Sequence, residues 1–316
     1  MARVAAIDCG TNSIRLLVAD VDRGDGGTTL RDVHREMRIV RLGQGVDATG
    51  RLAPEAIERT RAALADFTAI LRRKGTERVR MVATSATRDA ANKEDFFAMA
   101  RDTLGADAEV ISGDEEARLS FTGAVGDFEP DDGPFLVVDV GGGSTELVLG
   151  DWDGHAATVT AARSVDVGCV RITERCLPSD PPTPAEQKAA EEFALVVLEQ
   201  AFDAVPVAKA RTWIGVAGTM TQLSSLVQRL PSHDPSLVHL SRLSYQQLHE
   251  VSAELLAMTH AQRAANPTIH PGRVDVIAGG SLIVRVLADE LSAGAGITEL
   301  VISEHDILDG IALSIA

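Results

Sequence analysis

The sequence has few cysteines, and none has the spacing of a metal or redox motif. Cys9, Cys169 and Cys176 are the three cysteines among 316 residues, and no C-x-x-C pattern occurs. We therefore expect reduced thiols, as in cytoplasmic proteins, and no disulfide framework. The eight histidines form no H-x-H or H-E-x-x-H pattern, so no zinc site is predicted.

Aromatic residues and net positive charge are also scarce. Aromatics make up 3% of the chain, and the formal net charge is −16. Stacking of single-stranded bases needs aromatic platforms, and nucleic-acid binding needs a basic surface, so no nucleic-acid partner is predicted. A polyanionic substrate would have to be bound by local arginines and a metal ion, because the overall field repels it.

Long apolar runs are absent. No segment approaches the roughly 18 apolar residues of a membrane span, and residues 1–10 lack the apolar core of a signal peptide. We therefore expect no membrane partner and a cytoplasmic localisation. The length itself indicates about two domains, each large enough to bury its own core.

What the sequence does contain is an alternation of strand and helix patterns, which is typical of the α/β class with mixed sheets. A hairpin is predicted around the polar residues 9–13, and a loop rich in Asp, Pro and Gly at 126–134 is the expected domain boundary. The predicted strands are residues 3–8, 14–20, 33–40, 79–84, 109–111, 135–140, 146–149 and 212–216. The predicted helices are residues 54–74, 93–104, 112–124, 185–204, a helical stretch to about 230, 246–258 and 307–315.

The strongest signal is an internal repeat. The segment IDCGTNSIRLLVAD, from Ile7, aligns with VDVGGGSTELVLGD, from Val138, at a constant offset of 131 residues. Five positions are identical, and the apolar pattern is preserved. The pairs are Asp8 and Asp139, Gly10 and Gly141, Ser13 and Ser144, Leu16 and Leu147, and Asp20 and Asp151.

The chemistry of the repeated unit favours phosphate binding. Each strand ends in Asp and is followed by glycine and hydroxyl residues. Glycine lets an anion approach the backbone, and successive N–H groups in such a turn form an anion-binding concavity. The alternative is a pair of ordinary hairpins that both use Gly and Ser in their turns.

These two segments resemble the phosphate loops of the actin-like ATPase and sugar-kinase superfamily. Within it, DVGGGSTE at 139–146, combined with ISGDEEARL at 111–119, resembles the exopolyphosphatase / guanosine pentaphosphate phosphatase family. TSATRDA at 84–90, WIGVAGT at 213–219 and RVDVIAGG at 273–280 extend the resemblance over nearly the whole chain. Gly218 and Thr219 also fit an ordinary strand-to-helix turn.

The resemblance implies two ribonuclease-H-like (actin-like ATPase) lobes with mixed sheets around an interlobe cleft, and a homodimer. We expect the N-terminal lobe to comprise residues 1–124 plus 301–316, and the C-terminal lobe residues 125–300. Longer family members carry a further C-terminal helical domain, and this sequence stops after DGIAL. We therefore expect a preference for short polyphosphate chains.

Carboxylates at the ends of the hairpin strands are predicted to hold Mg²⁺, with Mn²⁺ as a possible substitute, because magnesium prefers hard oxygen ligands. Asp139 and Glu146 flank the glycine turn, and Asp8 is the repeat partner of Asp139. The alternative for Glu146 is a solvent-exposed strand residue.

Phosphate binding is assigned to the two turns and to three arginines, because guanidinium groups match phosphate oxygens in two-point geometry. The alternatives are an edge-strand arginine with a solvated head for Arg15, and structural ion pairs for the other two. The predicted residues are Gly10, Thr11, Asn12, Ser13, Arg15, Arg88, Gly141, Gly142, Gly143, Ser144, Thr145 and Arg273.

Glu116 is the predicted general base, because the resemblance places the family's catalytic glutamate at the second Glu of EEAR. Adjacent helix positions point about 100° apart, so Glu115 is expected to favour the helix N-terminus instead. Without the resemblance, the sequence would predict that Glu116 is a charged residue on the surface.

The predicted activity is hydrolysis of the terminal phosphoanhydride of inorganic polyphosphate. A guanosine pentaphosphate (pppGpp) phosphatase, or a dual enzyme, would use the same motifs. A non-catalytic sensor of polyphosphate or alarmone is disfavoured by the intact set Glu116, Asp139 and Glu146, and a kinase is disfavoured by EEARL.

Overall fold

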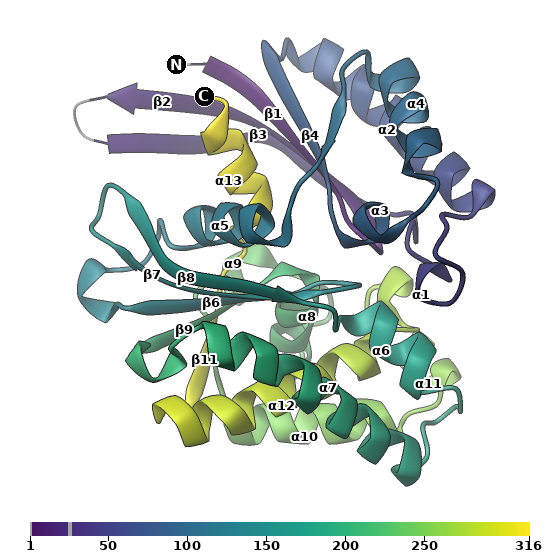
Figure 1. Ribbon diagram of the computed structural model, residues 1–316. Coiled ribbons are helices and arrows are strands. Elements are labelled where there is room, and N and C mark those ends of the chain that lie inside the picture. Colours follow the sequence, from purple (N-terminus) through teal and green to yellow (C-terminus); the bar gives the residue numbers. More distant parts are fainter. Residues whose placement is uncertain (1, 25–26) are drawn as a thin grey trace. The chain divides into compact units, whose positions relative to one another are not determined.

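The computed structural model describes residues 2–24 and 27–316, and the chain divides into two compact units. The first unit is Met1–Gly123 with His305–Ala316, and the second is Ala124–Glu304. Each unit has one mixed β-sheet with helices packed on it (Figure 1), so the predicted α/β class is confirmed. Within the described residues, no helix has the length and apolarity needed to span a membrane.

The first unit is built on a five-stranded sheet of order β3-β2-β1-β4-β5. Its strands are β1 (Ala2–Cys9), β2 (Ser13–Gly24), β3 (Gly27–Ile39), β4 (Arg78–Ala83) and β5 (Ala108–Val110). Its helices are α1 (Val46–Thr49), α2 (Pro54–Lys74), α3 (Ser85–Asp89), α4 (Lys93–Leu104), α5 (Gly113–Ala124) and α13 (Ile307–Ser314).

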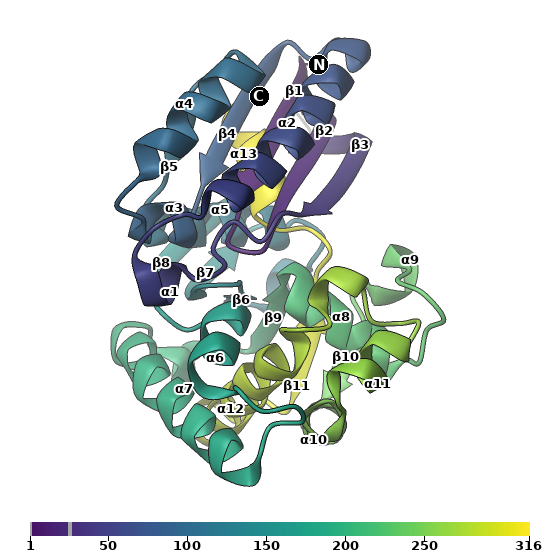
Figure 2. The ribbon, with the colours of Figure 1, turned by 90° about the vertical axis from the view of Figure 1, so that its right-hand side faces the viewer.

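Alternation along the strands puts a core on each face of this sheet. In β1, Ala5 and Ile7 pack in a cluster with side chains of α2 and α4. Val4 and Ala6 pack in a second cluster with side chains of α5 and α13. Successive strand residues point to opposite faces, so a wholly apolar strand needs cover on both. Figures 1 and 2 show α2 and α4 on one side of the sheet and α13, in yellow, on the other.

The second unit has a six-stranded sheet of order β10-β11-β9-β6-β7-β8. Its strands are β6 (Phe135–Val140), β7 (Thr145–Trp152), β8 (Ala157–Val165), β9 (Thr212–Val216), β10 (Arg242–Ser244) and β11 (Glu299–Ile302). Its α-helices are α6 (Cys169–Cys176), α7 (Pro184–Ala204), α8 (Ala217–Val227), α9 (Pro235–Val238), α10 (Tyr245–Ala257), α11 (His260–Ala265) and α12 (Ile277–Ala295). Short 3₁₀ turns lie at Pro130–Asp132, Val207–Lys209 and Pro271–Arg273.

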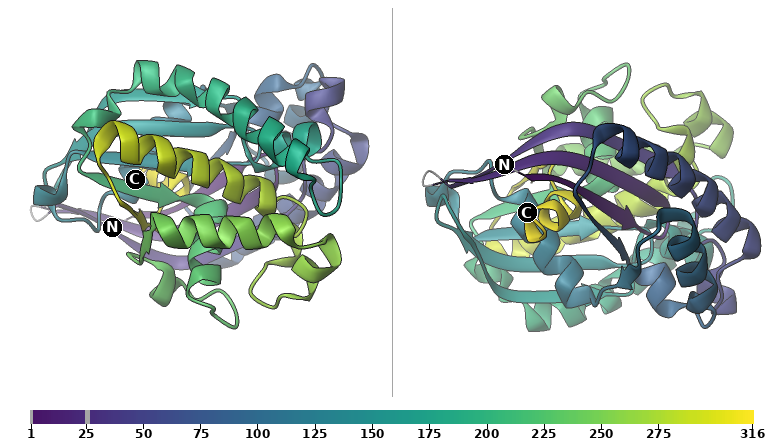
Figure 3. Two further views of the ribbon diagram at one scale, coloured as in Figure 1. Left: turned by 90° about the horizontal axis from the view of Figure 1, so that it is seen from below. Right: turned by 90° about the horizontal axis from the view of Figure 1, so that it is seen from above.

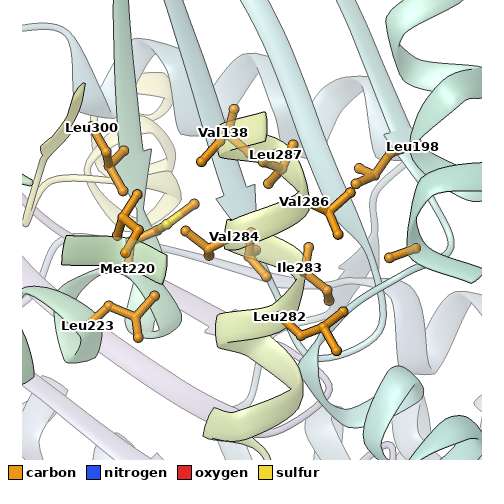
Figure 4. Close-up of a cluster of buried hydrophobic side chains, with 14 of the residues drawn as sticks. Val138, Leu198, Met220, Leu223, Leu282, Ile283, Val284, Val286, Leu287 and Leu300 are labelled. Atoms are coloured by element: carbon orange, nitrogen blue, oxygen red, sulfur yellow. The ribbon is translucent and has the colours of Figure 1, made fainter. Parts of the chain in front are cut away.

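Helix α12 is the centre of the second core. It lies between α7 and α10 on one face of the sheet (Figure 3). Figure 4 shows its apolar side chains directed toward β6, α7, α8 and β11. Leu282, Val284 and Leu287 are fully buried there together with Val138 and Met220. An apolar face of this width on a helix requires burial on several sides.

The two units repeat one topology. The order β3-β2-β1-β4 in the first sheet corresponds to β8-β7-β6-β9 in the second. The second hairpin strand of each unit carries a register shift, between Val18 and Ala19 in β2 and between Leu149 and Gly150 in β7. These positions are 131 residues apart, the offset of the sequence repeat. Unrelated hairpins would not share both the strand order and the bulge, which is a positioned feature of a strand.

Several elements differ from the sequence-based expectation. The strand expected at 33–40 runs from Gly27 to Ile39, and no element was predicted for β8, α6, α12 or β11. Helix α12 has two glycines in its first turn, which disfavour a helix locally. Both are needed there, because a Cβ on Gly279 would lie 2.4 Å from the Thr173 hydroxyl and one on Gly280 2.8 Å from Thr219 Cγ2.

Helices α5 and α13 of the first unit cross at two glycines. A Cβ on Gly123 would lie 1.8 Å from the Asp306 carbonyl oxygen, and one on Gly310 would lie 2.0 Å from the Leu119 carbonyl oxygen. Both obstacles are backbone atoms, which cannot move aside as a side chain can. The crossing therefore depends on the absence of side chains at these two positions.

We predict that Gly310→Ala lowers the free energy of unfolding by about 1–3 kcal/mol, because the added methyl forces α13 away from α5. Alanine is the better helix former, so propensity alone would predict stabilisation. Urea denaturation followed by circular dichroism measures the change. Gly126→Ala is the matched control, because its Cβ would meet nothing within 4 Å. Equal stability of both variants would contradict the close crossing.

The carboxylate of Asp309 has three polar partners, of which Arg35 in β3 joins α13 to the sheet. Its carboxylate accepts hydrogen bonds from Arg35 Nη2 at 2.6 Å and from the backbone N–H of Asp306 at 3.0 Å, and lies 2.9 Å from His305 Nδ1. Burial raises the pKa of Asp309, but the His305 hydrogen bond and the charge of Arg35 outweigh it and lower the pKa to about 2. The ionised form therefore stabilises the fold.

Because the folded-state pKa is depressed, this stabilisation is fully present above about pH 4 and is lost as the pH falls through about 2, a total of about 2 kcal/mol. We predict that the difference in unfolding free energy between wild type and Asp309→Asn shrinks by about that amount between about pH 5 and about pH 2. Urea denaturation at several pH values tests this. A difference independent of pH would mean that the charge of Asp309 contributes nothing.

Candidate active site

The glycine turn of the second unit lies between two buried carboxylates. Asp139 in β6 and Glu146 in β7 are directly opposite each other in the antiparallel register, so their side chains share one face of the sheet. Asp139 is 7% exposed and Glu146 is 1% exposed. The alternative of a solvent-exposed Glu146 does not hold. Two carboxylates buried side by side repel each other, and a cation would relieve that repulsion.

The backbone of this turn is held by the N-terminus of α6. Gly141 N–H donates to the Ser144 carbonyl at 3.0 Å and closes the turn. The Gly142 carbonyl accepts from Val170 N–H at 2.8 Å and from Arg171 N–H at 3.1 Å. Helix α6 begins after Gly168, where a Cβ would lie 2.6 Å from the Gly142 carbonyl. The turn is therefore preorganised by a helix that packs directly against it.

Three side chains complete this support, of which Thr145 belongs to the predicted phosphate-binding set and Arg171 and Thr219 do not. Arg171 Nε donates to the Gly143 carbonyl at 2.9 Å, and the Thr219 hydroxyl donates to the Val140 carbonyl at 2.9 Å. The Thr145 hydroxyl donates to the Val167 carbonyl at 2.5 Å. The sequence analysis missed Arg171, although the segment Gly168-Cys-Val-Arg after a strand could have indicated a helix N-terminus beside the turn.

Arg273, a predicted phosphate ligand, packs on Gly218 in the first turn of α8, directly after β9. A Cβ on Gly218 would lie 1.5 Å from a guanidinium nitrogen of Arg273, so only glycine leaves room for it. The preceding residue, Ala217, has φ of 64°, a left-handed conformation that is uncommon for a residue with a side chain. Burial raises the pKa of the nearby Cys169 thiol, and the positive charge of Arg273 opposes that shift.

In the first unit, the repeat partner of Asp139 is neutralised by an arginine. Arg15 is opposite Asp8 in the hairpin register, and its Nε and Nη2 donate to Asp8 Oδ2 at 3.0 and 2.8 Å. Arg15 Nη1 also pairs with Asp306. The Arg15 side chain is 17% exposed and lies in an inner strand, so the edge-strand alternative with a solvated head does not hold.

Burial and neighbouring charges have opposing effects on the pKa of Asp8. Burial raises the pKa of Asp8, the charge and hydrogen bonds of Arg15 lower it, and the charge of Asp306 raises it further. Asp8 Oδ1 is buried and has no hydrogen-bond partner within the described residues. A buried carboxylate oxygen without a donor fits a cation or a water held by one.

The turn of the first hairpin is fixed by a neighbouring loop. Gly10 N–H donates to the Ser13 carbonyl at 2.9 Å, which repeats the Gly141–Ser144 bond of the second unit. The Asn12 carbonyl accepts from the N–H groups of residues 40 and 41, and the Thr11 carbonyl accepts from that of residue 43. The Thr11 hydroxyl is hydrogen-bonded to the Ser85 hydroxyl at 2.9 Å.

The predicted general base, Glu116, lies near the start of α5 and is paired with Arg88. Arg88 Nη1 lies 3.2 Å from Glu116 Oε2 and donates to the Ile111 carbonyl at 3.1 Å. Glu116 is 8% exposed, unlike a surface charge. Glu115 points elsewhere: its side chain is 45% exposed and pairs with Arg80, and its N–H donates to the Ser112 hydroxyl. The two glutamates thus diverge as adjacent helix positions should.

The structure therefore brings the predicted residues together in two sets within the first unit and two within the second. Asp8 and Arg15 lie beside the turn Gly10–Ser13, and Glu116 lies with Arg88. Asp139 and Glu146 flank the turn 141–145, and Arg273 packs on Gly218. Within the second unit, the carboxylates of Asp139 and Glu146 are hard oxygen donors of the kind that magnesium prefers, so this pair fits a divalent cation.

Comparison with known proteins identifies relatives over the whole length. A family model described as the Ppx/GppA phosphatase family matches residues 17–315. Exopolyphosphatase 2 of Mycobacterium tuberculosis is 58% identical and is aligned over 100% of this chain and 99% of its own.

Solved structures show the same fold. A crystal structure of an exopolyphosphatase-like protein matches with a TM-score of 0.94 and 43% identity, covering 100% of this chain and 98% of the other. The Aquifex aeolicus PPX-GPPA enzyme matches with a TM-score of 0.78 and 32% identity, covering 99% of both chains. The two mixed sheets are those of the two-lobe actin-like fold. By family match, sequence identity and fold together, the chain belongs to the Ppx/GppA phosphatase family.

Proposed function

We propose that this protein is an exopolyphosphatase that releases terminal phosphate from inorganic polyphosphate with the help of Mg²⁺. The observation that carries the proposal is the pair of buried carboxylates Asp139 and Glu146 flanking a preorganised glycine turn. The likeness to exopolyphosphatase 2 supports it, at 58% identity over the full length.

In this proposal the two hairpin turns bind phosphate oxygens. The backbone of Gly10–Ser13 and of Gly141–Thr145 supplies N–H donors without side-chain obstruction at the glycines. Backbone hydrogen bonds fix both turns, from residues 40–43 to the first and from α6 to the second. The turns therefore need little reorganisation when an anion binds. Arg88 and Arg273 are the proposed arginine ligands of the substrate.

Asp139 and Glu146 would hold the metal ion, with Asp8 as a further ligand or a partner of a metal-bound water. Mg²⁺, when bound, neutralises charge on the phosphoryl oxygens. For Arg15 we propose a role beside the phosphate binding expected for it. Two carboxylates engage it, so we propose that it keeps Asp8 ionised and oriented.

Glu116 would accept the proton of the attacking water. Its carboxylate is buried, so its orientation is restricted, and Arg88 fixes one oxygen. A base held in this way aims the water in line with the scissile bond, which is the main requirement for phosphoanhydride hydrolysis.

We predict that Glu116→Gln lowers kcat by about 10²–10⁴-fold, because the amide retains the size of the side chain and cannot accept a proton. Phosphate release from polyphosphate at saturating Mg²⁺ measures the loss, and the thermal midpoint should stay near that of wild type. Glu115→Gln is the matched control, since its exposed carboxylate pairs with Arg80. Near-wild-type turnover of Glu116→Gln would remove Glu116 from the mechanism.

We further predict that Glu146→Gln weakens divalent-cation binding by at least about 10-fold, because the site loses one of its charged ligands. Titration with Mn²⁺ in the absence of substrate, followed by electron paramagnetic resonance, reports the metal directly. The first hairpin's Asp20→Asn is a control, because Asp20 pairs with Arg3 and Arg31 instead. Unchanged Mn²⁺ affinity in Glu146→Gln would exclude Glu146 as a ligand.

The second candidate substrate is guanosine pentaphosphate, because the same phosphate-binding motifs would serve it. Both substrates end in a phosphoanhydride. A comparison of kcat/KM on guanosine pentaphosphate and on polyphosphates of several lengths separates an exopolyphosphatase from a dual enzyme. A homodimer, a cytoplasmic localisation and the use of Mn²⁺ in place of Mg²⁺ complete the proposal.

A further inference from the structure

Ser164 in β8 is hydrogen-bonded to one of the proposed metal ligands. Its hydroxyl donates to Glu146 Oε1 at 2.7 Å, a short distance for a hydroxyl and a carboxylate. The two residues are directly opposite in the β7–β8 register, just as Asp139 and Glu146 are in the β6–β7 register. Asp139, Glu146 and Ser164 therefore form a row across three adjacent strands, on one face of the sheet.

The first unit carries the corresponding row with different chemistry. Asp8 is opposite Arg15 in β1–β2, and Arg15 is opposite Met37 in β2–β3. Where the middle residue is a cation, the third residue is a methionine. Where the middle residue is a carboxylate, the third residue is a hydroxyl donor. The second unit therefore places a hydroxyl donor beside its middle carboxylate, and the first unit has no such donor at the equivalent position.

The hydrogen bond restricts a flexible side chain. A glutamate has three rotatable bonds, and a strand position leaves several rotamers open. A donor on the neighbouring strand fixes one carboxylate oxygen of Glu146, whose surroundings leave it 1% exposed. Outer partners of this kind orient metal ligands and strengthen binding without touching the metal.

We infer that Ser164 is a positioning residue that orients Glu146 for divalent-cation binding. The inference rests on the proposed role of Glu146 as a metal ligand and adds to it the residue that sets its geometry. The expected signature is a loss of metal affinity, with little change in turnover or in substrate KM once the metal is saturating.

The test is a Mn²⁺ titration without substrate, followed by electron paramagnetic resonance, on the full chain. Ser164→Ala should raise the Kd for Mn²⁺ about 10-fold, and Ser164→Thr, which keeps the hydroxyl, should bind within about 2-fold of wild type. Thr160→Ala is the matched control, because Thr160 is an exposed hydroxyl residue on the same strand. Phosphate release against Mg²⁺ concentration should show a rightward shift for Ser164→Ala and a near-wild-type plateau.

Two outcomes separate this inference from the proposed function. If Glu146→Gln loses Mn²⁺ affinity while Ser164→Ala binds as wild type does, Ser164 has no positioning role and only the inference fails. If Glu146→Gln itself binds Mn²⁺ normally, or wild type binds none, the metal assignment fails. Should Ser164→Ala not fold, Ser164→Val replaces it, since valine suits a strand position and has no side-chain donor. Wild-type affinity in Ser164→Val would then overturn the inference.

Discussion

The burial of one carboxylate at the carboxyl end of the central strand is the constraint on which each unit depends. Asp8 is the penultimate residue of β1 and Asp139 that of β6, and each is at most 7% exposed. A buried carboxylate loses its hydration and must be compensated by donors or cations. In each unit, the surrounding hairpin, turn and helix supply the groups that lie around this buried carboxylate.

The two copies of the hairpin meet the constraint in different ways. In the first unit the opposite residue is Arg15, which pairs with Asp8 and with Asp306 at the start of α13. In the second unit the opposite residue is Glu146, which adds negative charge. The first copy thus shares one arginine between two carboxylates, while the second copy places two carboxylates opposite each other. This difference fits the proposed roles, in which Asp139 and Glu146 are the main metal ligands.

Several close contacts with the backbone are possible only because glycine has no side chain. Gly168 allows α6 to approach the Gly141–Gly143 turn. Gly218 leaves room for Arg273 on the first turn of α8. Gly123 and Gly310 allow α5 and α13 to cross. These approaches are closer than a Cβ would permit. A site that binds anions through its backbone benefits from this, because N–H donors that are already aligned need not be reorganised.

The α/β class, the two hairpins and most of the long helices could be predicted from the sequence, because turn residues and apolar periodicity are local properties of the chain. The constant offset of 131 residues further indicated that Asp8 and Asp139 are equivalent. The ion-pair and hydrogen-bond partners of these residues became known only from the tertiary structure. Arg15 meets Asp306 across 291 residues of sequence, and Ser164 meets Glu146 through strand β8, which no local pattern had predicted. Such pairs depend on which faces pack together and in which register, and no short window of sequence contains that information.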